Sequence, residues 1–203
     1  MVNQFSTATS ILRGYDADQA CGVARVLVGS KVKNMEIALN TDGAFETIRA
    51  LSEGFSDKLN IGAGTVLTLE QLKRAADAGA CFVLAPSMMS QEMVDFCHEN
   101  SILCIPGAYS PSEIRECFQR GADIVKVFPA NELSKSYARK VCEPLGDLKL
   151  MAVGGVNEKT LPEYLAGGYA YVGSAGGIFK KADILAGNED AMRASLKAFE
   201  AGL

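Results

Sequence analysis

Lys126 is the residue with the strongest chemical potential in this sequence, because it interrupts an otherwise apolar strand. It lies in Asp123-Ile-Val-Lys-Val-Phe-Pro-Ala130, a run typical of a buried β-strand that stops at Pro129. Successive side chains of a strand alternate between its faces, so Ile124, Lys126 and Phe128 share one face. Lysine is rarely buried unless another group pairs with it or a reaction uses it. This amine is therefore either half of a buried ion pair or a catalytic group.

Glu36 is the carboxylate that could meet this amine. In Met35-Glu-Ile-Ala-Leu-Asn40, the alternation places Glu36, Ala38 and Asn40 on the inner face of a second strand. Across a narrow barrel, one inward carboxylate and one inward amine would lie within reach of each other. A structural ion pair is one interpretation, but desolvation can cancel the attraction within such a pair.

Covalent catalysis by Lys126 is the other interpretation. An amine attacks a ketone only in its neutral form, so its pKa must fall from about 10.4 toward about 7–8. The apolar neighbours Ile124 and Phe128 would lower the pKa by desolvation, whereas an ionised Glu36 would raise it. Glu36 could also move the protons that carbinolamine formation, dehydration and carbon–carbon cleavage require.

Two glycine-rich segments form a second candidate site. They are Val153-Gly-Gly-Val156 and Val172-Gly-Ser-Ala-Gly-Gly177, and each follows one of the last two predicted strands. Glycine lets backbone N–H groups approach an anion closely. In barrels, the loops after the last two strands commonly bind phosphate. The alternative is that these glycines only form tight turns.

Strands that alternate with helices along the whole chain must position these residues. The predicted strands are Ser10–Arg13, Asn34–Leu39, Asn60–Gly64, Phe82–Ala85, Leu103–Pro106, Ile124–Phe128, Lys149–Val153 and Tyr169–Gly173. The predicted helices are Asp16–Val28, Ala44–Glu53, Leu69–Ala78, Ser90–Asn100, Pro111–Arg120, Asn131–Glu143, Thr160–Ala166 and Glu189–Ala201. Eight βα units without a linker predict an α/β fold, a compact (β/α)8 TIM barrel that forms a single domain over residues 1–203. A doubly wound open sheet is the alternative, but the chain has only Gly62-Ala-Gly64 in place of G-x-G-x-x-G.

Helix-terminal signals agree with this alternation. Asp16 and Gln19 predict a capping box, and Ser110 before Pro111 predicts another helix start with Glu113 completing the box. The glycines expected to end helices are Gly79, Gly121 and Gly167.

Composition narrows the class of protein. The 203 residues carry a net charge of −4 without a basic stripe, which argues against a nucleic-acid partner. No apolar run is long enough to span a membrane and the start lacks a secretory signal, so we expect a cytoplasmic protein. The six cysteines form no C-x-x-C pair and are expected to be buried, reduced thiols. His98 is the single histidine, which argues against a His-ligated catalytic metal.

Five segments, in order along nearly the whole chain, resemble the class I pyruvate-dependent aldolases of 2-keto-3-deoxy-6-phosphosugar acids. This KDPG/KHG aldolase family includes 6-phosphogluconate, 6-phosphogalactonate and 4-hydroxy-2-oxoglutarate enzymes. The segments are Ile11-Leu-Arg-Gly14, Met35-Glu-Ile-Ala-Leu-Asn-Thr41, Gly62-Ala-Gly-Thr-Val-Leu67, Val125-Lys-Val-Phe-Pro-Ala130 and Ala152-Val-Gly-Gly-Val156. The resemblance implies an aldehyde-lyase that releases pyruvate and glyceraldehyde 3-phosphate.

The resemblance also implies roles for individual residues. Lys126 would form the Schiff base and Glu36 would act as general acid and base. Thr65 and Pro86 would lie at the pyruvyl group, with Phe128 beside it. The residues implied for the phosphate are Gly154, Gly155, Gly173 and Ser174. The family works without a metal or another cofactor and is typically a homotrimer.

Within the family, Asn40 and Val153 match the phosphogalactonate type, because the phosphogluconate type usually has arginine and threonine there. Arg13 would then bind the substrate carboxylate or a neighbouring hydroxyl. Ala38 and Ala175 depart from the phosphogalactonate pattern, which often has proline and an acid. Two other functions fit the same barrel: a phosphosugar isomerase or epimerase, and a non-catalytic phosphosugar-binding protein.

Overall fold

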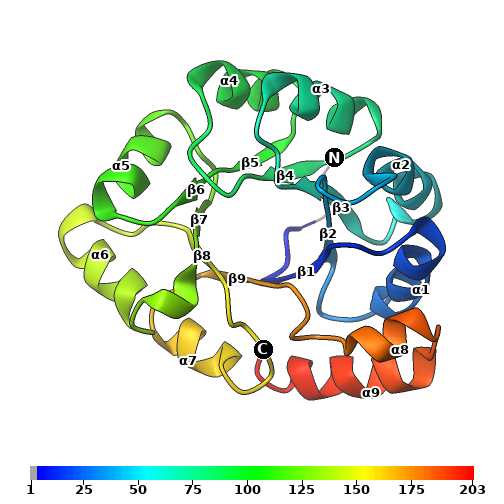
Figure 1. The fold of residues 1–203 in the computed structure, drawn as a ribbon. Coiled ribbons are helices and arrows are strands. Elements are labelled where there is room, and N and C mark those ends of the chain that lie inside the picture. The colour runs from blue at the N-terminus through cyan, green and yellow to red at the C-terminus, as the bar shows by residue number, and fades with distance from the viewer. Residues whose placement is uncertain (1–3) are drawn as a thin grey trace.

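The computed structural model describes residues 4–203, which form a ring of parallel strands surrounded by helices (Figure 1). The strands are β1 (Ala8–Leu12), β2 (Asn34–Ala38), β3 (Asn60–Gly64), β4 (Phe82–Leu84), β5 (Leu103–Ile105), β6 (Gly107–Ala108), β7 (Val125–Val127), β8 (Leu150–Val153) and β9 (Tyr171–Ser174). Their order in the sheet is β5-β4-β3-β2-β1-β9-β8-β7-β6, and every pair is parallel. The predicted TIM-barrel architecture is confirmed.

The fifth barrel position is split at Pro106, which the sequence pattern did not predict. Its first half, β5, pairs with β4, and its second half, β6, pairs with β7. Proline lacks the N–H group that an unbroken strand would donate to the ladder. Lys126 N donates to Pro106 O at 2.9 Å, and Asp123 N donates to Cys104 O at 3.1 Å. The ring therefore closes through the chain on both sides of Pro106.

Helices cover the outer face of the ring. They are α1 (Ala17–Leu27), α2 (Ala44–Phe55), α3 (Leu69–Asp77), α4 (Gln91–Glu99), α5 (Pro111–Gln119), α6 (Tyr137–Leu145), α7 (Leu161–Ala166), α8 (Lys181–Leu185) and α9 (Glu189–Glu200), with a 3₁₀ turn η1 (Ala130–Glu132) before α6. The two predicted capping boxes, at Asp16 with Gln19 and at Ser110 with Glu113, are both present.

Two sequence predictions about the helices need correction. The predicted helix Asn131–Glu143 begins only at Tyr137, because η1 ends at Leu133 in extended backbone. The short helix α8 was missed, since five residues carry too little periodicity to be recognised. Gly167 is the C-cap of α7, as predicted, and Gly168 after it takes the positive φ, at 99°. Gly167 is also needed for space, because a Cβ there would lie 1.8 Å from Lys135 O.

The core has two layers, as the alternation of side chains predicts. Inward residues fill the barrel and outward residues pack under the helices. The inner cluster is Ile11, Phe82, Leu84, Ile105, Ile124, Met151 and Val153. Val125 and Val127 belong to the outer cluster, as do Met35 and Ile37. The predicted facing of the strands that carry Lys126 and Glu36 is therefore confirmed.

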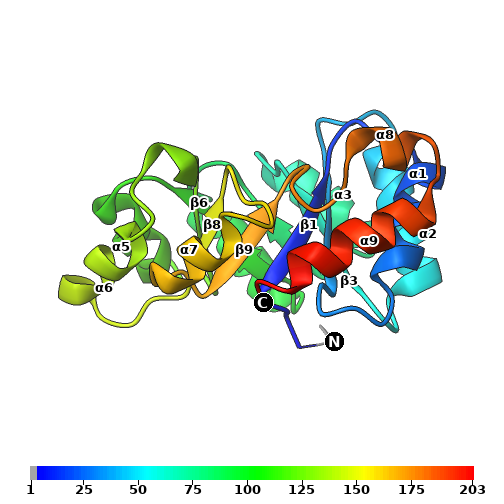
Figure 2. The same ribbon diagram turned by 90° about the horizontal axis from the view of Figure 1, so that it is seen from below.

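Aromatic rings close the amino-terminal end of the barrel. The ring of Phe5 packs edge-on against Phe82 at 5.2 Å and against Tyr171 at 5.7 Å. Figure 2 shows the carboxyl end of the chain and the segment that leads into β1 at this side of the molecule, opposite the loop that leads into α8. Water is thereby kept from the lower end of the lumen, and the carboxyl ends of the strands remain as its mouth.

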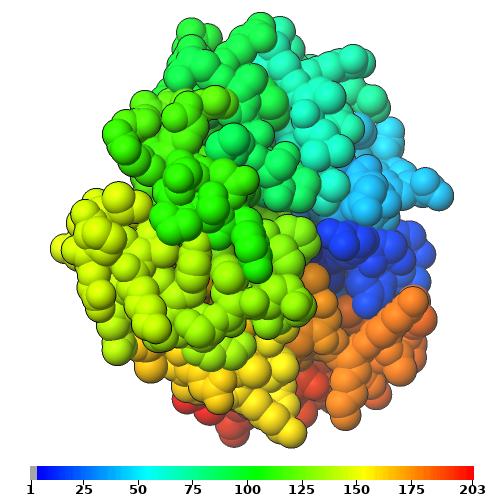
Figure 3. All heavy atoms as spheres, turned by 60° about the vertical axis from the view of Figure 1, so that its left-hand side comes forward, coloured from blue at the N-terminus to red at the C-terminus, as the bar shows by residue number. Residues whose placement is uncertain are grey.

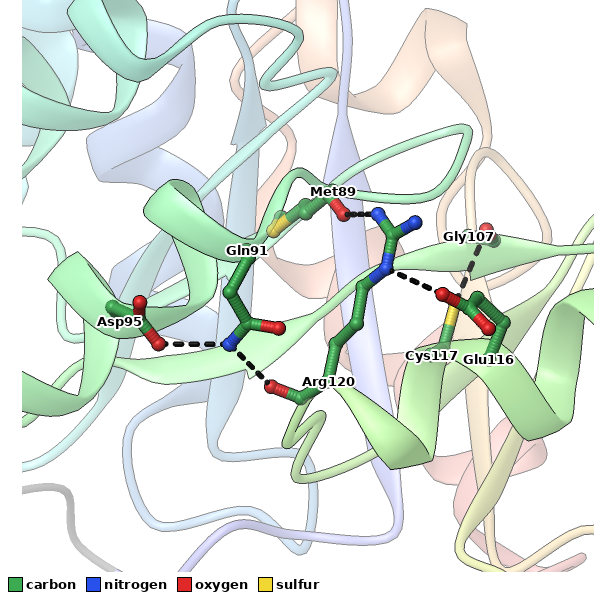
Figure 4. Close-up of polar contacts among 7 residues, drawn as sticks. All are labelled: Met89, Gln91, Asp95, Gly107, Glu116, Cys117 and Arg120. Carbon is green, nitrogen blue, oxygen red and sulfur yellow. Dashed lines mark hydrogen bonds and ion pairs between the residues drawn. The ribbon is translucent and has the colours of Figure 1, made fainter.

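A polar network joins α4 to the carboxyl end of α5 (Figure 4). Arg120 donates through Nη1 to Met89 O at 2.8 Å and through Nε to Glu116 at 3.0 Å. Gln91 donates to Arg120 O at 3.0 Å and to Asp95 at 2.8 Å. These bonds tie the two helices that flank the split strand.

No helix within residues 4–203 combines the length and apolar character that a membrane crossing requires.

Candidate active site

A cavity of about 340 Å³ opens at the carboxyl ends of the strands, where barrel active sites lie. Its lining comes from Ile11, Arg13, Glu36, Lys126, Phe128, Val153 and the loop residues 154–157 and 175–177. In Figure 3 the segments that contribute to this mouth adjoin one another: the segment after β1 in blue, residues near 130 in yellow-green and residues near 175 in orange. A larger, more open hollow of about 640 Å³ lies beside the same loops, but neither Lys126 nor Glu36 lines it.

Lys126 projects from β7 into this cavity and is only 5% exposed. Burial lowers the pKa of its amine, the Glu36 carboxylate opposes that shift, and Arg13 adds to it. The amine lies 4.9 Å from the centre of the Phe128 ring. Burial outweighs the carboxylate, so the neutral, nucleophilic form of this amine is more accessible than that of a lysine in water.

Glu36 projects from β2 on the opposite side of the barrel and is 1% exposed. Burial raises the pKa of its carboxyl, whereas Lys126 and Arg13 lower it by a smaller amount. Its Oε2 atom has no hydrogen-bond partner among the described residues. Among the ion pairs of residues 4–203, none joins Glu36 to Lys126. The two groups thus face one cavity with a polar atom left available, rather than neutralising each other in a tight pair.

Two glycines of β3 make room for this arrangement. A Cβ on Gly64 would lie 1.5 Å from Oε1 of Glu36, and a Cβ on Gly62 would lie 2.4 Å from the Phe82 ring. The two glycines of Gly62-Ala-Gly64 therefore leave space on the inner face of the barrel for the side chains of Phe82 and Glu36. The space at Gly64 lets a carboxyl side chain lie flat across the neighbouring strand.

Six of the predicted site residues line the cavity. They are Arg13, Glu36, Lys126, Phe128, Gly154 and Gly155. Arg13 is exposed at the rim, immediately after β1. Gly154 and Gly155 have φ values of 115° and 67°, and Asn131 lies so close that a Cβ on either would meet it within 3 Å. Only glycine fits this backbone and this space.

The other five predicted residues lie near the mouth but outside the cavity lining. Asn40 is exposed beyond the end of β2, and Pro86 is half-buried after β4. Thr65 is half-buried with φ at 58°, an unusual backbone conformation for a β-branched residue. Gly173 packs against Val153 and Ile11 inside the barrel, and the Ser174 hydroxyl is buried between two loops.

The sequence prediction did not assign several residues that line the cavity. Asn157, Gly176 and Gly177 join the two glycine-rich loops around it. Gly177 has no room for a Cβ, which would lie 2.0 Å from Val156 O. The second glycine pair of the 172–177 segment was the available signal, because one glycine suffices for a turn. Within residues 4–203, no group of three or more His, Cys, Asp or Glu side chains is placed to hold a metal ion.

Fold and site together define a barrel enzyme with a buried amine, a buried carboxyl and two glycine-rich loops at one mouth. The family model of KDPG and KHG aldolases matches residues 5–194. The chain belongs to this family and is an aldolase, a carbon–carbon lyase.

Individual relatives agree with the family. A protein from Rhizobium meliloti (strain 1021), named probable 2-dehydro-3-deoxy-6-phosphogalactonate aldolase, is 32% identical over 84% of this chain and 81% of its own. A 2-dehydro-3-deoxy-phosphogluconate aldolase from Treponema pallidum (strain Nichols) is 34% identical over 73% and 70%. The structure of KDPG aldolase from Legionella pneumophila, described with pyruvate captured as a covalent carbinolamine, is 27% identical. It superposes with a TM-score of 0.85, covering 97% of this chain and 94% of that chain.

Proposed function

We propose that the chain cleaves a 2-dehydro-3-deoxy-6-phosphosugar acid to pyruvate and glyceraldehyde 3-phosphate through a Schiff base at Lys126. The substrate is the 6-phosphogalactonate or the 6-phosphogluconate epimer, and 4-hydroxy-2-oxoglutarate is a further candidate. The observation that carries this proposal is the buried Lys126 amine, whose pKa burial lowers, facing the buried Glu36 carboxyl in one cavity. Relatives named for both epimers support it.

The reaction follows from these two groups. The neutral amine adds to the C2 ketone, Glu36 delivers a proton to the departing oxygen, and loss of water leaves the iminium. The Glu36 carboxylate then removes the proton of the C4 hydroxyl. The C3–C4 bond breaks, its electron pair passes to the iminium nitrogen, and the aldehyde departs. Glu36 returns the proton to C3 of the enamine, and water hydrolyses the Schiff base to pyruvate and free Lys126.

The remaining residues bind the substrate in this proposal. Arg13 is the cation at the rim, suited to the substrate carboxylate or a hydroxyl. The phosphate rests on the backbone around Gly154, Gly155, Gly173 and Ser174, where glycine allows close approach. Thr65 and Pro86 are assigned to the pyruvyl group, and Asn40 to the choice of epimer, from the family resemblance.

Reduction with borohydride in the presence of pyruvate tests the proposal directly. A stable three-carbon adduct should appear on the peptide that contains Lys126, and Lys126→Ala should lose turnover while keeping its fold. An unmodified peptide, or turnover by Lys126→Ala near the parent rate, would favour the isomerase or epimerase alternative. Comparing kcat/KM for the two epimers and for 4-hydroxy-2-oxoglutarate then identifies the substrate.

We also infer a homotrimer in the cytoplasm. Leu67, Met88, Tyr109 and Phe128 are large apolar residues that remain exposed after β3, β4, β6 and β7, which adjoin one another in the ring. Exposed apolar groups gathered at one end commonly mark an interface. A structural neighbour, 26% identical with a TM-score of 0.85, is a cage designed by fusing symmetric oligomeric domains. All six cysteines are free, which suits a reducing compartment.

A further inference from the structure

Three consecutive carbonyl groups of the loop after β8 each accept a hydrogen bond from a side-chain hydroxyl. Tyr164 donates to Gly154 O at 2.9 Å, Thr160 to Gly155 O at 2.7 Å, and Ser174 to Val156 O at 2.7 Å. The hydroxyls come from three places: the middle of α7, the residue before α7, and the end of β9. Two elements, α7 with its N-cap residue and β9, therefore fix one short stretch of backbone.

These bonds determine where the N–H groups of the loop point. In a trans peptide the C=O of one residue and the N–H of the next point in opposite directions. Holding the carbonyls of Gly154 and Gly155 on the hydroxyls therefore turns the N–H groups of Gly155 and Val156 the other way. Neither N–H donates to a protein acceptor within residues 4–203. Both residues line the cavity, so two free donors are available at its wall.

The loop Gly154–Val156 contains two consecutive glycines, so its backbone conformation must be fixed by contacts such as these hydrogen bonds. Gly154 and Gly155 have positive φ values, and glycine passes readily between such conformations. The Tyr164 ring, by contrast, is fully buried and fixed. The Lys135 amine lies 3.5 Å from its centre, and the Tyr169 ring packs edge-on at 5.6 Å. The buried and tightly packed phenol of Tyr164 therefore anchors two glycines whose backbone has few conformational restraints of its own.

We propose that Tyr164 and Thr160 are positioning residues that hold the loop after β8 as a receptor for the phosphate of the substrate. The inference rests on the proposed function. It assigns the hydroxyl clamp, formed by Tyr164, Thr160 and Ser174, to recognition of the phosphate and not to the carbon–carbon cleavage. The side chains do not touch substrate; they act through the peptide groups that they orient.

Tyr164→Phe tests the inference, with Tyr169→Phe as the matched control. Both changes remove one buried phenolic oxygen, but Tyr169 Oη has no hydrogen-bond partner among the described residues. Tyr164→Phe should raise the KM for the phosphorylated sugar acid and the inhibition constant of inorganic phosphate about two- to tenfold. Its kcat/KM for 4-hydroxy-2-oxoglutarate, which carries no phosphate, should change less than twofold. Tyr169→Phe should alter none of these values.

Thr160 supplies a second, independent pair of variants. Thr160→Ser keeps a hydroxyl near Gly155 O and should retain phosphate inhibition, whereas Thr160→Val should weaken it. Equal losses on phosphorylated and unphosphorylated substrates, or equal effects of Tyr164→Phe and Tyr169→Phe, would overturn the inference. So would a wild-type enzyme that inorganic phosphate does not inhibit. Failure of the proposed function is a separate result, namely no pyruvate adduct at Lys126 in the wild type.

Discussion

At the scale of single residues, the proposed chemistry depends on two buried groups, Lys126 and Glu36, whose charged forms are both disfavoured by burial. Burial lowers the pKa of Lys126 and raises the pKa of Glu36, and in each case the partner opposes the shift without overcoming it. When burial favours the uncharged forms of an amine and a carboxyl group, the two can exchange protons through a substrate held between them. A tight ion pair would instead keep the amine protonated and unreactive.

The neighbouring charges should move the pH profile of Schiff-base formation in opposite directions. Glu36 raises the pKa of Lys126, so Glu36→Gln should shift the acidic limb to lower pH. Arg13 lowers that pKa, so Arg13→Ala should shift the limb to higher pH. The position of the acidic limb is measured by following the rate of pyruvate trapping by borohydride from about pH 5 to about pH 10. Arg49→Ala on α2 is the control and should not move it; shifts of equal sign would contradict the assignment.

The space left by Gly64 should be as important as the carboxyl that occupies it. In Gly64→Ala the new methyl would overlap Glu36 Oε1, so the carboxyl must turn away and kcat should fall at least about tenfold. Gly54→Ala is the control, because nothing lies within 4 Å of that position in α2. It should raise the free energy of unfolding by about 0.4–1 kcal/mol and leave kcat unchanged. Equal kcat values for both variants would remove the proposed role of Gly64.

The burial of Lys126 and Glu36 should also lower the free energy of unfolding of the protein. Stability contributed by Glu36 falls as pH rises from its unfolded value of 4.5 toward its raised folded pKa. For Lys126 it falls as pH drops from 10.5 toward the lowered folded pKa. The free energy of unfolding of the double variant Lys126→Met with Glu36→Gln should therefore be higher than that of the wild type by about 0.5–2 kcal/mol. The difference should be largest at intermediate pH. Urea unfolding at several pH values measures this gain, and a pH-independent difference would contradict it.

At the scale of elements, the split fifth strand is the point at which the ladder of the ring is interrupted. β5 and β6 contain three and two residues, and Pro106 lies between them. The Asp123 carboxylate accepts a hydrogen bond from Cys104 N at 2.8 Å, next to the backbone bond from Asp123 N to Cys104 O. One side chain thus joins β5 to the segment that leads into β7, which carries Lys126.

Asp123→Ala should therefore destabilise the barrel by about 1–3 kcal/mol, because the Cys104 amide loses its acceptor. Asp123→Asn keeps an amide oxygen in the same place and should lie closer to the wild type. The free energy of unfolding in urea compares the variants. If alanine and asparagine were equally destabilising, the charge of Asp123 rather than the hydrogen bond would be responsible. His98, 3.9 Å from the same carboxylate, would be the partner to examine next.

Element order and facing could be read from the sequence because each depends on local patterns. The alternation around Lys126 and Glu36 and the caps at Asp16 and Ser110 need no knowledge of the rest of the chain. The delayed start of α6 and the clamp on Gly154–Val156 could not be read in this way. They depend on contacts such as Asn131 against Gly154 and Ser174 against Val156, which exist only after β7, β8 and β9 have been placed side by side.

At the scale of the whole molecule, one end of the barrel holds the proposed active site and also presents exposed apolar side chains. Leu67, Met88, Tyr109 and Phe128 are exposed there, and Phe128 also lines the cavity. Burying these side chains against a second copy would remove apolar area from water and stabilise an assembly. The proposed active site and the proposed interface would then share a residue.

Leu67→Glu combined with Met88→Glu should convert the proposed trimer to monomers, because carboxylates would be placed inside the interface. Leu185→Glu is the matched control: Leu185 is 52% exposed, close to the 55% of Leu67, but it lies on α8. Sedimentation equilibrium measures the mass of each variant. A wild-type monomer at micromolar concentration, or dissociation caused equally by Leu185→Glu, would show that the end bearing Leu67 and Met88 is not the interface. Phe128 belongs to both the proposed active site and the proposed interface, so loss of assembly should also raise KM. If Phe128 took no part in the interface, loss of assembly would leave KM unchanged.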